Sequence, residues 1–533
     1  MPRRVPTGSP LAISNLVASA LACATLVCGA VGTAQAAERD TRLADAAMNR
    51  DTAAVRSLLV QKGVDVNAPG RDGTPALHWM IRVDDLATAS ALLRAGADPK
   101  LSTRYGVTPM SIAASNGNSA MVKLLLEGGA DANTPDGAGE TPLMMAAKVG
   151  SLDTVKALLG GGATLDARDA NFQQTALMVA VRANHPPLVK FFIEQGASVH
   201  SQTRMGETPR WVLPNSVPGF GHGIGIIRGG LPERGSRYLI PGAMTPLMYA
   251  ARDGRLEAAR LLLDAGAKIE QTDANDITPL LAAIANNHPD VARFLIERGA
   301  NINAVDWYGR TPLWTAVEAR NMDADNNTFV NNVDRAPLLD LIDVLLDKGA
   351  SPNVRTKESP PIRRQMLAVT GTLEWVDFTG QTPFIRAALA GDVTVMKRLL
   401  AHGADPKIST FGGTTALMAA AGVNWVVDQT FDEGPKAVLD AVQLCAELGL
   451  DVNAINSMGL TAVHGAANRG SDDIIRFLVS KGARVDVKDK EGRSPLTWAE
   501  GVFLATHPAR PKPTSIQLLK GLMGGTPVAA ARE

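Results

Sequence analysis

The chain has 533 residues, and its 53 Lys and Arg residues balance its 53 Asp and Glu residues, so the formal net charge is +0 at pH 7. Hydrophobic residues make up 45 % of the chain but aromatic residues only 4 %, which favours a core of aliphatic side chains and alanine. Proteins that bind nucleic acid through its phosphates carry a surplus of basic residues. We therefore expect no nucleic-acid partner.

Residues 1–36 have the features of a secretory signal. Arg3 and Arg4 give a positive start, residues 11–31 are mostly apolar, and Ala36 ends an Ala-Gln-Ala triplet of the kind that precedes a cleavage site. We expect cleavage near Ala36, a periplasmic or secreted protein, and no stable membrane insertion after cleavage. An uncut anchor is the alternative, because the apolar stretch approaches the length that spans a bilayer.

Cysteine usage fits export without disulfides. Two of the three cysteines, Cys23 and Cys28, lie in the signal, so the mature chain keeps Cys445 alone. One cysteine cannot form an internal bridge. Because Cys445 lies in an apolar helical stretch, we expect it to be a small buried residue rather than a redox group.

A Thr-Pro-Leu-like anchor recurs along the chain at a spacing close to 33 residues. A fixed period of this size predicts a stack of small structural repeats, and such stacks expose long surfaces that bind other molecules. The anchors begin at Thr74, Thr108, Thr141, Thr175, Thr208, Thr245, Thr278, Thr311, Thr382, Thr415, Thr461 and Ser494.

The unit that begins at Thr141 shows the local structure that we expect in each repeat. Thr141 caps a first helix, and Pro142 takes the first helical position, where its missing N–H needs no partner. Gly150 ends this helix. A second helix runs through Val155, and Gly162 suits the left-handed conformation that follows it.

This pattern resembles the ankyrin repeat, in which a β-turn precedes two antiparallel helices. His78 and His464 match the family's Thr-Pro-Leu-His motif, and the resemblance covers residues 41–523. It implies an all-α solenoid of about twelve repeats, which binds a protein partner. Residues 43–67 would form the N-terminal cap, and the unit from Ser494 would form the C-terminal cap.

Four departures from the period predict long insertions. The first, 211–242, is rich in glycine and proline, and like the third, 354–378, it lies between repeats, where the hairpin loops are expected. The second, 321–337, and the fourth, 423–435, would separate the two helices of one repeat, at the opposite edge of the stack. The repeats then occupy 41–210, 243–353 and 379–523, followed by a tail at 524–533.

The composition of these insertions favours recognition of a protein partner. Arginine and aromatic residues anchor protein interfaces, and loops on a rigid scaffold often carry binding residues. We hypothesise that the basic inter-repeat insertions contact an acidic group of the partner. A structural explanation stays open, in which the aromatic side chains pack on the repeats and the arginines are solvated. The candidate contact residues are Phe220, Arg228, Arg234, Arg237, Arg363, Arg364, Trp375 and Trp425.

Other motifs are weaker. Residues 219–225 resemble a phosphate loop but lack the Gly-Lys-Ser/Thr ending. Asp and Asn residues from Asp323 to Asp334 follow a calcium-loop spacing, but Thr328 stands where glycine makes the turn. We expect a monomeric protein that is no enzyme and has no cofactor or metal. The alternatives are an enzyme or accessory subunit with a pocket formed by the insertions, and a small-molecule or metal binder.

Overall fold

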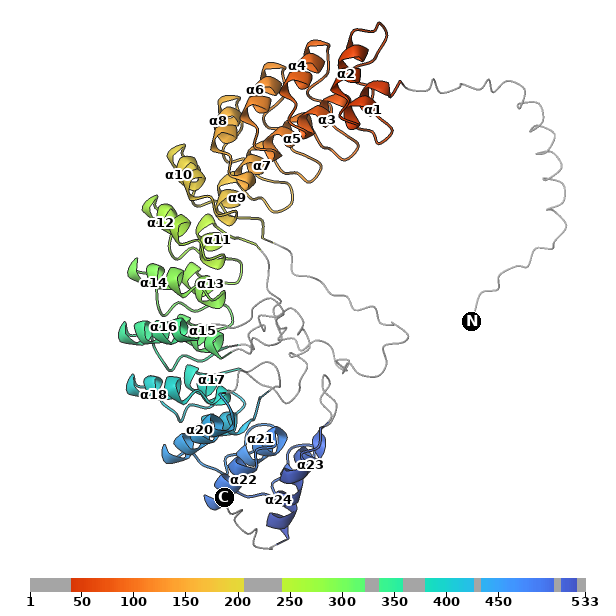
Figure 1. Cartoon of the computed structure of the whole chain (residues 1–533). Helices are drawn as coiled ribbons and strands as arrows, with labels where there is room; N and C mark the ends of the chain where they lie inside the picture. The colour runs from red at the N-terminus through yellow and green to blue at the C-terminus, as the bar shows by residue number, and fades with distance from the viewer. Residues whose placement is uncertain are drawn as a thin grey trace, which may run out of the picture. The chain divides into compact units, whose positions relative to one another are not determined.

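The computed structural model describes residues 40–205, 242–321, 335–357, 379–425, 433–502 and 510–524. Within these ranges the chain forms twenty-four α-helices, and its only β-pairing is an isolated bridge between Pro69 and Pro75. The helices follow one another in twelve antiparallel pairs (Figure 1). The predicted all-α fold of repeated helix pairs is therefore confirmed.

Each pair consists of a short first helix and a second helix. The first helices are α1 (Arg42–Met48), α3 (Ala76–Arg82), α5 (Pro109–Ser115), α7 (Pro142–Val149), α9 (Ala176–Arg182), α11 (Pro246–Arg252), α13 (Pro279–Ala285), α15 (Pro312–Arg320), α17 (Pro383–Ala390), α19 (Ala416–Ala421), α21 (Ala462–Arg469) and α23 (Pro495–Gly501). The second helices are α2 (Thr52–Leu59), α4 (Leu86–Arg94), α6 (Ser119–Glu127), α8 (Leu152–Gly160), α10 (Pro186–Glu194), α12 (Leu256–Asp264), α14 (Pro289–Glu297), α16 (Ala336–Asp347), α18 (Val393–Ala401), α20 (Pro435–Glu447), α22 (Asp472–Ser480) and α24 (Pro513–Met523).

The helices belong to two compact units, divided after Gly137. The first unit contains α1 to α6, and the second contains α7 to α24. Within each unit, first helices pack on the first helices of neighbouring pairs, as α1 does on α3 and α7 on α9. In the second unit the first helices form the inner layer of a curved stack and the second helices the outer layer (Figure 1). None of the described helices is long and apolar enough to cross a membrane.

The helix boundaries follow from local chemistry. The Oγ1 of Thr141 accepts a hydrogen bond from the backbone N–H of Met144 at 3.3 Å, and Pro142 is the first residue of α7. Gly150 ends α7 with φ +85°, and Gly162 follows α8 with φ +88°, a conformation that is strained for residues with a Cβ. These local predictions are confirmed. The same side-chain cap begins the first helices at Thr108, Thr175, Thr245, Thr278, Thr311, Thr382, Thr415 and Ser494.

Small residues allow the helices of neighbouring repeats to pack closely. Ala146 and Ala147 are fully buried, and so is Val155 on the second helix of the same pair. A Cβ atom on Gly465 would lie 2.5 Å from the backbone nitrogen of Val423, so only glycine fits there between α19 and α21. Each pair therefore depends on its neighbours for its buried surface, as expected for a repeat stack.

Tight hairpins connect the pairs. The N–H of Thr410 donates to the carbonyl of Thr414 at 2.9 Å, and the N–H of Thr414 donates to the Oγ1 of Thr410 at 2.9 Å. In the second unit, backbone hydrogen bonds also join each hairpin to the next and form a ladder along the edge of the stack. The bonds of this hairpin ladder are Arg204 N–H to Phe172 O, Ala274 to Gly242, Trp307 to Asn275, Lys357 to Tyr308, Phe411 to Thr379, Ser457 to Gly412 and Lys490 to Met458.

Candidate interaction surface

Seven of the eight predicted contact residues lie outside the described residues: Phe220, Arg228, Arg234, Arg237, Arg363, Arg364 and Trp375. The glycine-rich motif at 219–225 and the calcium-like residues from Asp323 to Asp334 lie outside them as well. All of these remain predictions. The structure does describe the residues at which each insertion leaves the stack.

Trp425 is the one predicted contact residue that the structure describes. Its side chain is half-buried, and the guanidinium of Arg469 on α21 lies 4.6 Å from the centre of its ring. Its backbone N–H donates to the carbonyl of Gly422 at 3.2 Å. The indole thus packs on the next repeat and presents one part of its surface to solvent.

The first insertion leaves the stack from a closed hairpin. The N–H of Thr203 donates to the carbonyl of Met244 at 3.0 Å, and the N–H of Met244 donates to the Oγ1 of Thr203 at 2.9 Å. These residues are 41 positions apart, whereas Thr410 and Thr414 make the same two bonds four positions apart. The insertion therefore extends the tip of a hairpin and leaves its base intact.

The third insertion has the same kind of base. The N–H of Thr356 donates to the carbonyl of Gln381 at 3.1 Å, and the N–H of Gln381 donates to the Oγ1 of Thr356 at 2.9 Å across 25 positions. Lys357 and Thr379 on either side belong to the hairpin ladder. Residues 354–357 are therefore part of the hairpin base. Both inter-repeat insertions leave from the same edge of the second unit.

The second insertion leaves between α15 and α16, above a buried ion network. The Nε of Arg320, at the end of α15, donates to Asp392 Oδ2 at 2.9 Å, and its Nη1 donates to the carbonyl of Arg335 at 2.6 Å. The Nε of Arg335 in turn donates to the carbonyl of Arg320 at 3.0 Å, so the two ends of the insertion hold each other. The side chains of Arg320 and Asp392 are only 9 % and 1 % exposed.

The fourth insertion ends at the same network, because Glu433, just before α20, forms an ion pair with Arg335. Asp392 serves two roles here: its Oδ2 accepts from the two arginines, and its Oδ1 caps α18 by accepting from the N–H of Val395 at 3.1 Å. We call Arg320, Arg335, Asp392 and Glu433 the root network. It joins the bases of the two inter-helix insertions, which lie two repeats apart.

Several buried polar groups near the base of the third insertion have no hydrogen-bond partner within the part of the chain that the structure describes. They are Trp314 Nε1, the side-chain amide of Gln381, and Nη1 of Arg386. Arg386 also forms an ion pair with Glu318 on the neighbouring first helix.

Three cations lie in a row on consecutive first helices. Lys148 on α7, Arg182 on α9 and Arg252 on α11 each follow their anchor threonine by seven residues. Lys148 and Arg182 are exposed. Residues three apart share one face of a helix, so the residues at anchor plus four lie beside the cations. We call the six residues at these positions the inner strip: Met145, Lys148, Val179, Arg182, Tyr249 and Arg252.

Tyr249 lies between two guanidinium groups of the inner strip. Arg252 lies 4.8 Å and Arg182 5.3 Å from the centre of its ring. Burial raises the pKa of the Tyr249 hydroxyl, and the two arginines oppose that shift. Because the phenol stays neutral at neutral pH, it forms no ion pair with the two arginines, which can therefore pair with carboxylates. Arg252 already forms an ion pair of this kind, with Asp253 at 2.7 Å.

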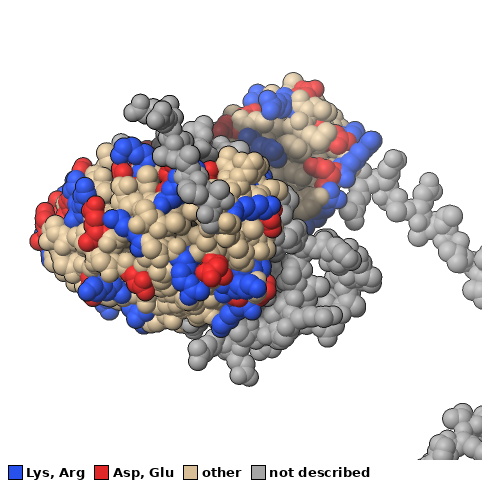
Figure 2. All heavy atoms as spheres, turned by 90° about the horizontal axis from the view of Figure 1, so that it is seen from below, with Lys and Arg blue, Asp and Glu red and all other residues tan. Residues whose placement is uncertain are grey.

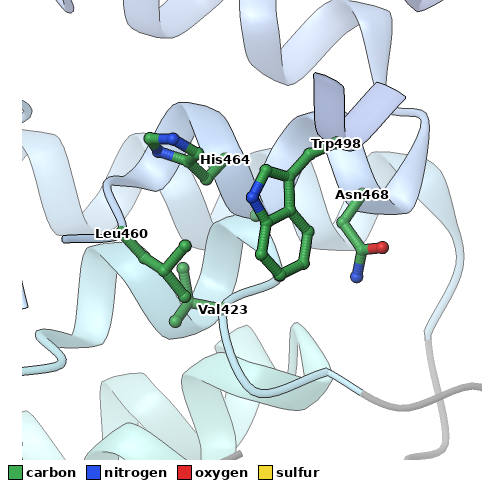
Figure 3. Close-up of a pocket in the computed structure, with 7 residues that line it drawn as sticks. Val423, Leu460, His464, Asn468 and Trp498 are labelled. Carbon is green, nitrogen blue, oxygen red and sulfur yellow. The ribbon is translucent and has the colours of Figure 1, made fainter. Parts of the chain in front are cut away.

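A small hollow of about 10 Å³, open to solvent, lies among α19, α21 and α23 (Figure 3). Ligand pockets are usually larger, from roughly 300 Å³ upwards. The indole of Trp498 donates to Asp489 at 2.9 Å, and the ring of His464 contacts the carbonyl of Arg493 at 3.3 Å. The polar groups of these rings are thus satisfied by the protein, and the hollow lacks the features of a ligand site.

The described residues contain no group of three or more metal-ligating side chains. Cys445 is fully buried, and burial raises the pKa of its thiol to about 12, which confirms the expected small buried residue. His78 and His464 are buried as well and contact the next hairpin through their ring nitrogens. On the face shown in Figure 2, basic and acidic side chains are interspersed and form no continuous basic patch.

The inner strip was not among the predicted contact residues, although the sequence contains its signal. Counting seven residues from each anchor gives cations in three consecutive repeats of the second unit. The later repeats have Ala285, Glu318, Leu389, Gly422, Asn468 and Gly501 at this position. Counting within the repeat, rather than in the insertions, would have identified the strip.

A family model described as "Ankyrin repeats (3 copies)" matches residues 43–136, 110–203, 247–356 and 436–501, and a second model described as "Ankyrin repeat" matches residues 379–411. Among curated proteins, the chain is 33 % identical to human B-cell lymphoma 3 protein over 120 residues, 22 % of this chain and 24 % of that protein. It is 26 % identical over 171 residues to alpha-latrocrustotoxin-Lt1a of Latrodectus tredecimguttatus, 32 % of this chain and 10 % of the toxin.

A third relative, Ankyrin repeat-containing protein P1E11.10 of Schizosaccharomyces pombe, is 40 % identical over 66 residues, 12 % of this chain and 32 % of the yeast protein. The chain thus spans a third or less of the length of each of these relatives. Their likeness concerns the repeats.

Proposed function

Because the chain belongs to the ankyrin-repeat family, whose repeats commonly mediate contacts between proteins, we propose that it is an exported scaffold that holds a protein partner. The observation that carries this proposal is the placement of two long insertions on the hairpin ladder. Their bases at Thr203–Met244 and Thr356–Gln381 are fixed by backbone hydrogen bonds. A rigid stack with long loops at one edge is an arrangement that supports recognition.

The mechanism is binding without chemistry. A preformed surface loses little conformational entropy on association, so more of the contact energy remains as affinity. The basic and aromatic residues of the inter-repeat insertions, among them Arg234, Arg363 and Trp375, would supply the anchors. We propose a monomer with a single protein partner from the same compartment.

Export rests on residues 1–36, whose charge, apolar stretch and final Ala-Gln-Ala support cleavage after Ala36. Mass spectrometry of the protein purified from its own cells should find Ala37 as the first residue. An intact Met1 on the folded protein would contradict export by cleavage.

Capture of the partner tests the scaffold. The mature protein is crosslinked in its own compartment, and the captured proteins are compared with those of a variant in which a short Gly-Asn turn replaces residues 358–378. Thr356 and Gln381 stay in place, so the hairpin base should still close. We expect capture by the natural chain and a loss of about tenfold or more in the variant, because interface anchors carry most of the binding energy.

A matched variant replaces residues 426–432 of the fourth insertion, which leaves from the other edge, and keeps the candidate contact residue Trp425. This variant should capture the partner normally. Undiminished capture by the variant lacking 358–378 would remove the third insertion from the proposal. Absence of any captured protein from the correctly folded natural chain would count against the scaffold itself.

A further inference from the structure

We propose that the inner strip binds an acidic, amphipathic, extended segment of the protein partner. This inference rests on the proposed scaffold function and specifies the chemistry of the partner. The strip joins a row of cations, Lys148, Arg182 and Arg252, to an apolar floor formed by Met145, Val179 and Tyr249. The helices that carry them, α7, α9 and α11, pack in that order.

The spacing of the row selects the form of the bound segment. Packed helices lie roughly 8–10 Å apart, so the cations repeat at about that distance. A chain in the polyproline II conformation advances roughly 9 Å per three residues and returns to the same face. Carboxylates at every third position would therefore meet the three cations in turn. The apolar residues between them would lie over this floor, where Val179 is half-buried and the exposed fractions of Met145 and Tyr249 are 6 % and 5 %.

The charges around the strip leave a positive surplus. Asp253 pairs with Arg252, but Arg255 adds a further cation beside Arg182, whose carbonyl accepts from it at 3.3 Å. Asp169 on the adjoining hairpin already accepts from the backbone N–H of Asn171, Phe172 and Gln174 at 2.6–2.8 Å. The four cations Lys148, Arg182, Arg252 and Arg255 therefore outnumber the two carboxylates nearby, Asp253 and Asp169.

Helix stability alone does not account for the row. A cation near the C-terminus of a helix interacts favourably with the helix dipole, and this benefit would be available to every first helix. The first helices from α13 onward lack a cation at the equivalent position, where α15 has Glu318 and α17 has Leu389. Other first helices do carry a cation in the last turn, Arg82 on α3, Arg320 on α15 and Arg469 on α21, but at other positions. Within the second unit, a cation at the seventh residue after the anchor occurs in three consecutive repeats, which aligns the three side chains in one row.

The strip adjoins the base of the first insertion. Thr203 follows α9 and α10, and Met244 directly precedes the anchor of α11, so the hairpin base belongs to the repeats that carry Arg182 and Tyr249. A segment on the strip would therefore bind the same repeats that hold the base of the first insertion.

A labelled nine-residue peptide, (Asp-Pro-Leu)₃, provides the test on the full mature chain by fluorescence anisotropy. We expect the affinity of this peptide to fall as the salt concentration rises. The uncharged peptide (Asn-Pro-Leu)₃ should bind about tenfold or more weakly. Arg182→Glu should weaken binding about tenfold. The control Lys190→Glu removes an exposed cation from the outer helix α10 of the same repeat and should leave the affinity unchanged.

Equal binding of the Asp and Asn peptides, or equal effects of Arg182→Glu and Lys190→Glu, would overturn this inference. Lys148→Glu provides a second exposed site, so the test does not depend on the folding of one variant. If Arg182→Glu still captures the partner normally in the crosslinking experiment, the strip is excluded while the scaffold stands. If the natural chain captures nothing, the scaffold proposal fails regardless of peptide binding.

Discussion

The two inter-repeat insertions and the two inter-helix insertions are held at their bases by different means. Thr203–Met244 and Thr356–Gln381 close their insertions with backbone hydrogen bonds and one threonine hydroxyl. The inter-helix insertions instead end at the root network, which is made of charged side chains. The first kind of base depends on the backbone, and the second on the identity of particular residues.

This difference teaches where the second unit is sensitive to substitution. A neutral hydrogen bond contributes about 1 kcal/mol, so a hairpin base tolerates most single changes. A buried ion pair carries a large desolvation cost, and removing one partner leaves the other charge buried and uncompensated. Substitutions in the root network should therefore destabilise the protein more than substitutions at the hairpin bases.

Asp392→Ala should have the largest effect. It removes the carboxylate that pairs with Arg320 and Arg335 and also the cap of α18, so we expect a loss of about 3–5 kcal/mol in the free energy of unfolding. Urea unfolding of the full chain measures it. The control Asp440→Ala, in an exposed pair with Lys436, should cost at most about 0.5 kcal/mol. Equal costs for the two variants would show that the buried pairs of Asp392 stabilise the fold no more than an exposed pair does.

Acid should destabilise the contact of His464 with the hairpin at Arg493, a hairpin that carries no insertion. The Nδ1 of His464 accepts from the N–H of Thr461 at 3.1 Å, and burial lowers the pKa of its ring to about 4. The unfolded pKa is near 6.5, so the unfolded chain binds the proton more readily. The contribution of neutral His464 to the free energy of unfolding is fully present above pH 6.5. It falls by about 2–3 kcal/mol as the pH decreases towards 4.

Trp314 occupies the position of His464 beside the base of the third insertion, so that hairpin should keep its stability in this pH range. Thermal unfolding at pH 7 and pH 4.5 checks this for the natural chain and for His464→Gln, which cannot gain the ring proton. An unchanged difference between the two pH values in His464→Gln would assign the acid sensitivity to other groups.

Thr356→Val should cost about 1–2 kcal/mol, because the N–H of Gln381 loses its hydroxyl partner in a buried site. Thr410→Val makes the same change in a hairpin of ordinary length and is the matched control. We expect equal losses in urea unfolding of the two variants. A much larger loss for Thr356→Val would show that the third insertion destabilises its hairpin base.

Glu433→Gln should have the smallest effect, about 0.5–1 kcal/mol, because its pair with Arg335 is partly exposed and open to screening by salt. The loss measured in urea at low ionic strength should shrink in 0.5 M salt. Glu491→Gln, in an exposed pair with Arg493, provides the comparison. A salt-independent loss larger than that of Asp392→Ala would place the centre of the network at Glu433 instead.

The sequence predicted the helix pairs because their signals are local. Thr141, Pro142 and Gly150 act on the backbone within one helix turn, so their roles could be inferred from position alone. The hairpin bases could not be located in this way, since Thr203 and Met244 pair across 41 residues of unrelated composition. The contact of Arg320 with Asp392 spans 72 residues and depends on the packing of α15 against α17.

The hairpin bases also bear on how such a protein can change. The same hydrogen bonds close the hairpin base whether its two residues are four, 25 or 41 positions apart. The packing of the neighbouring repeats therefore does not depend on the length of the segment between them. Thr356 and Gln381 thus delimit a cassette, into which foreign segments could be transplanted without redesign of the stack. Mutations in the inserted segment could therefore change which partner is bound while the fold of the repeats stays the same.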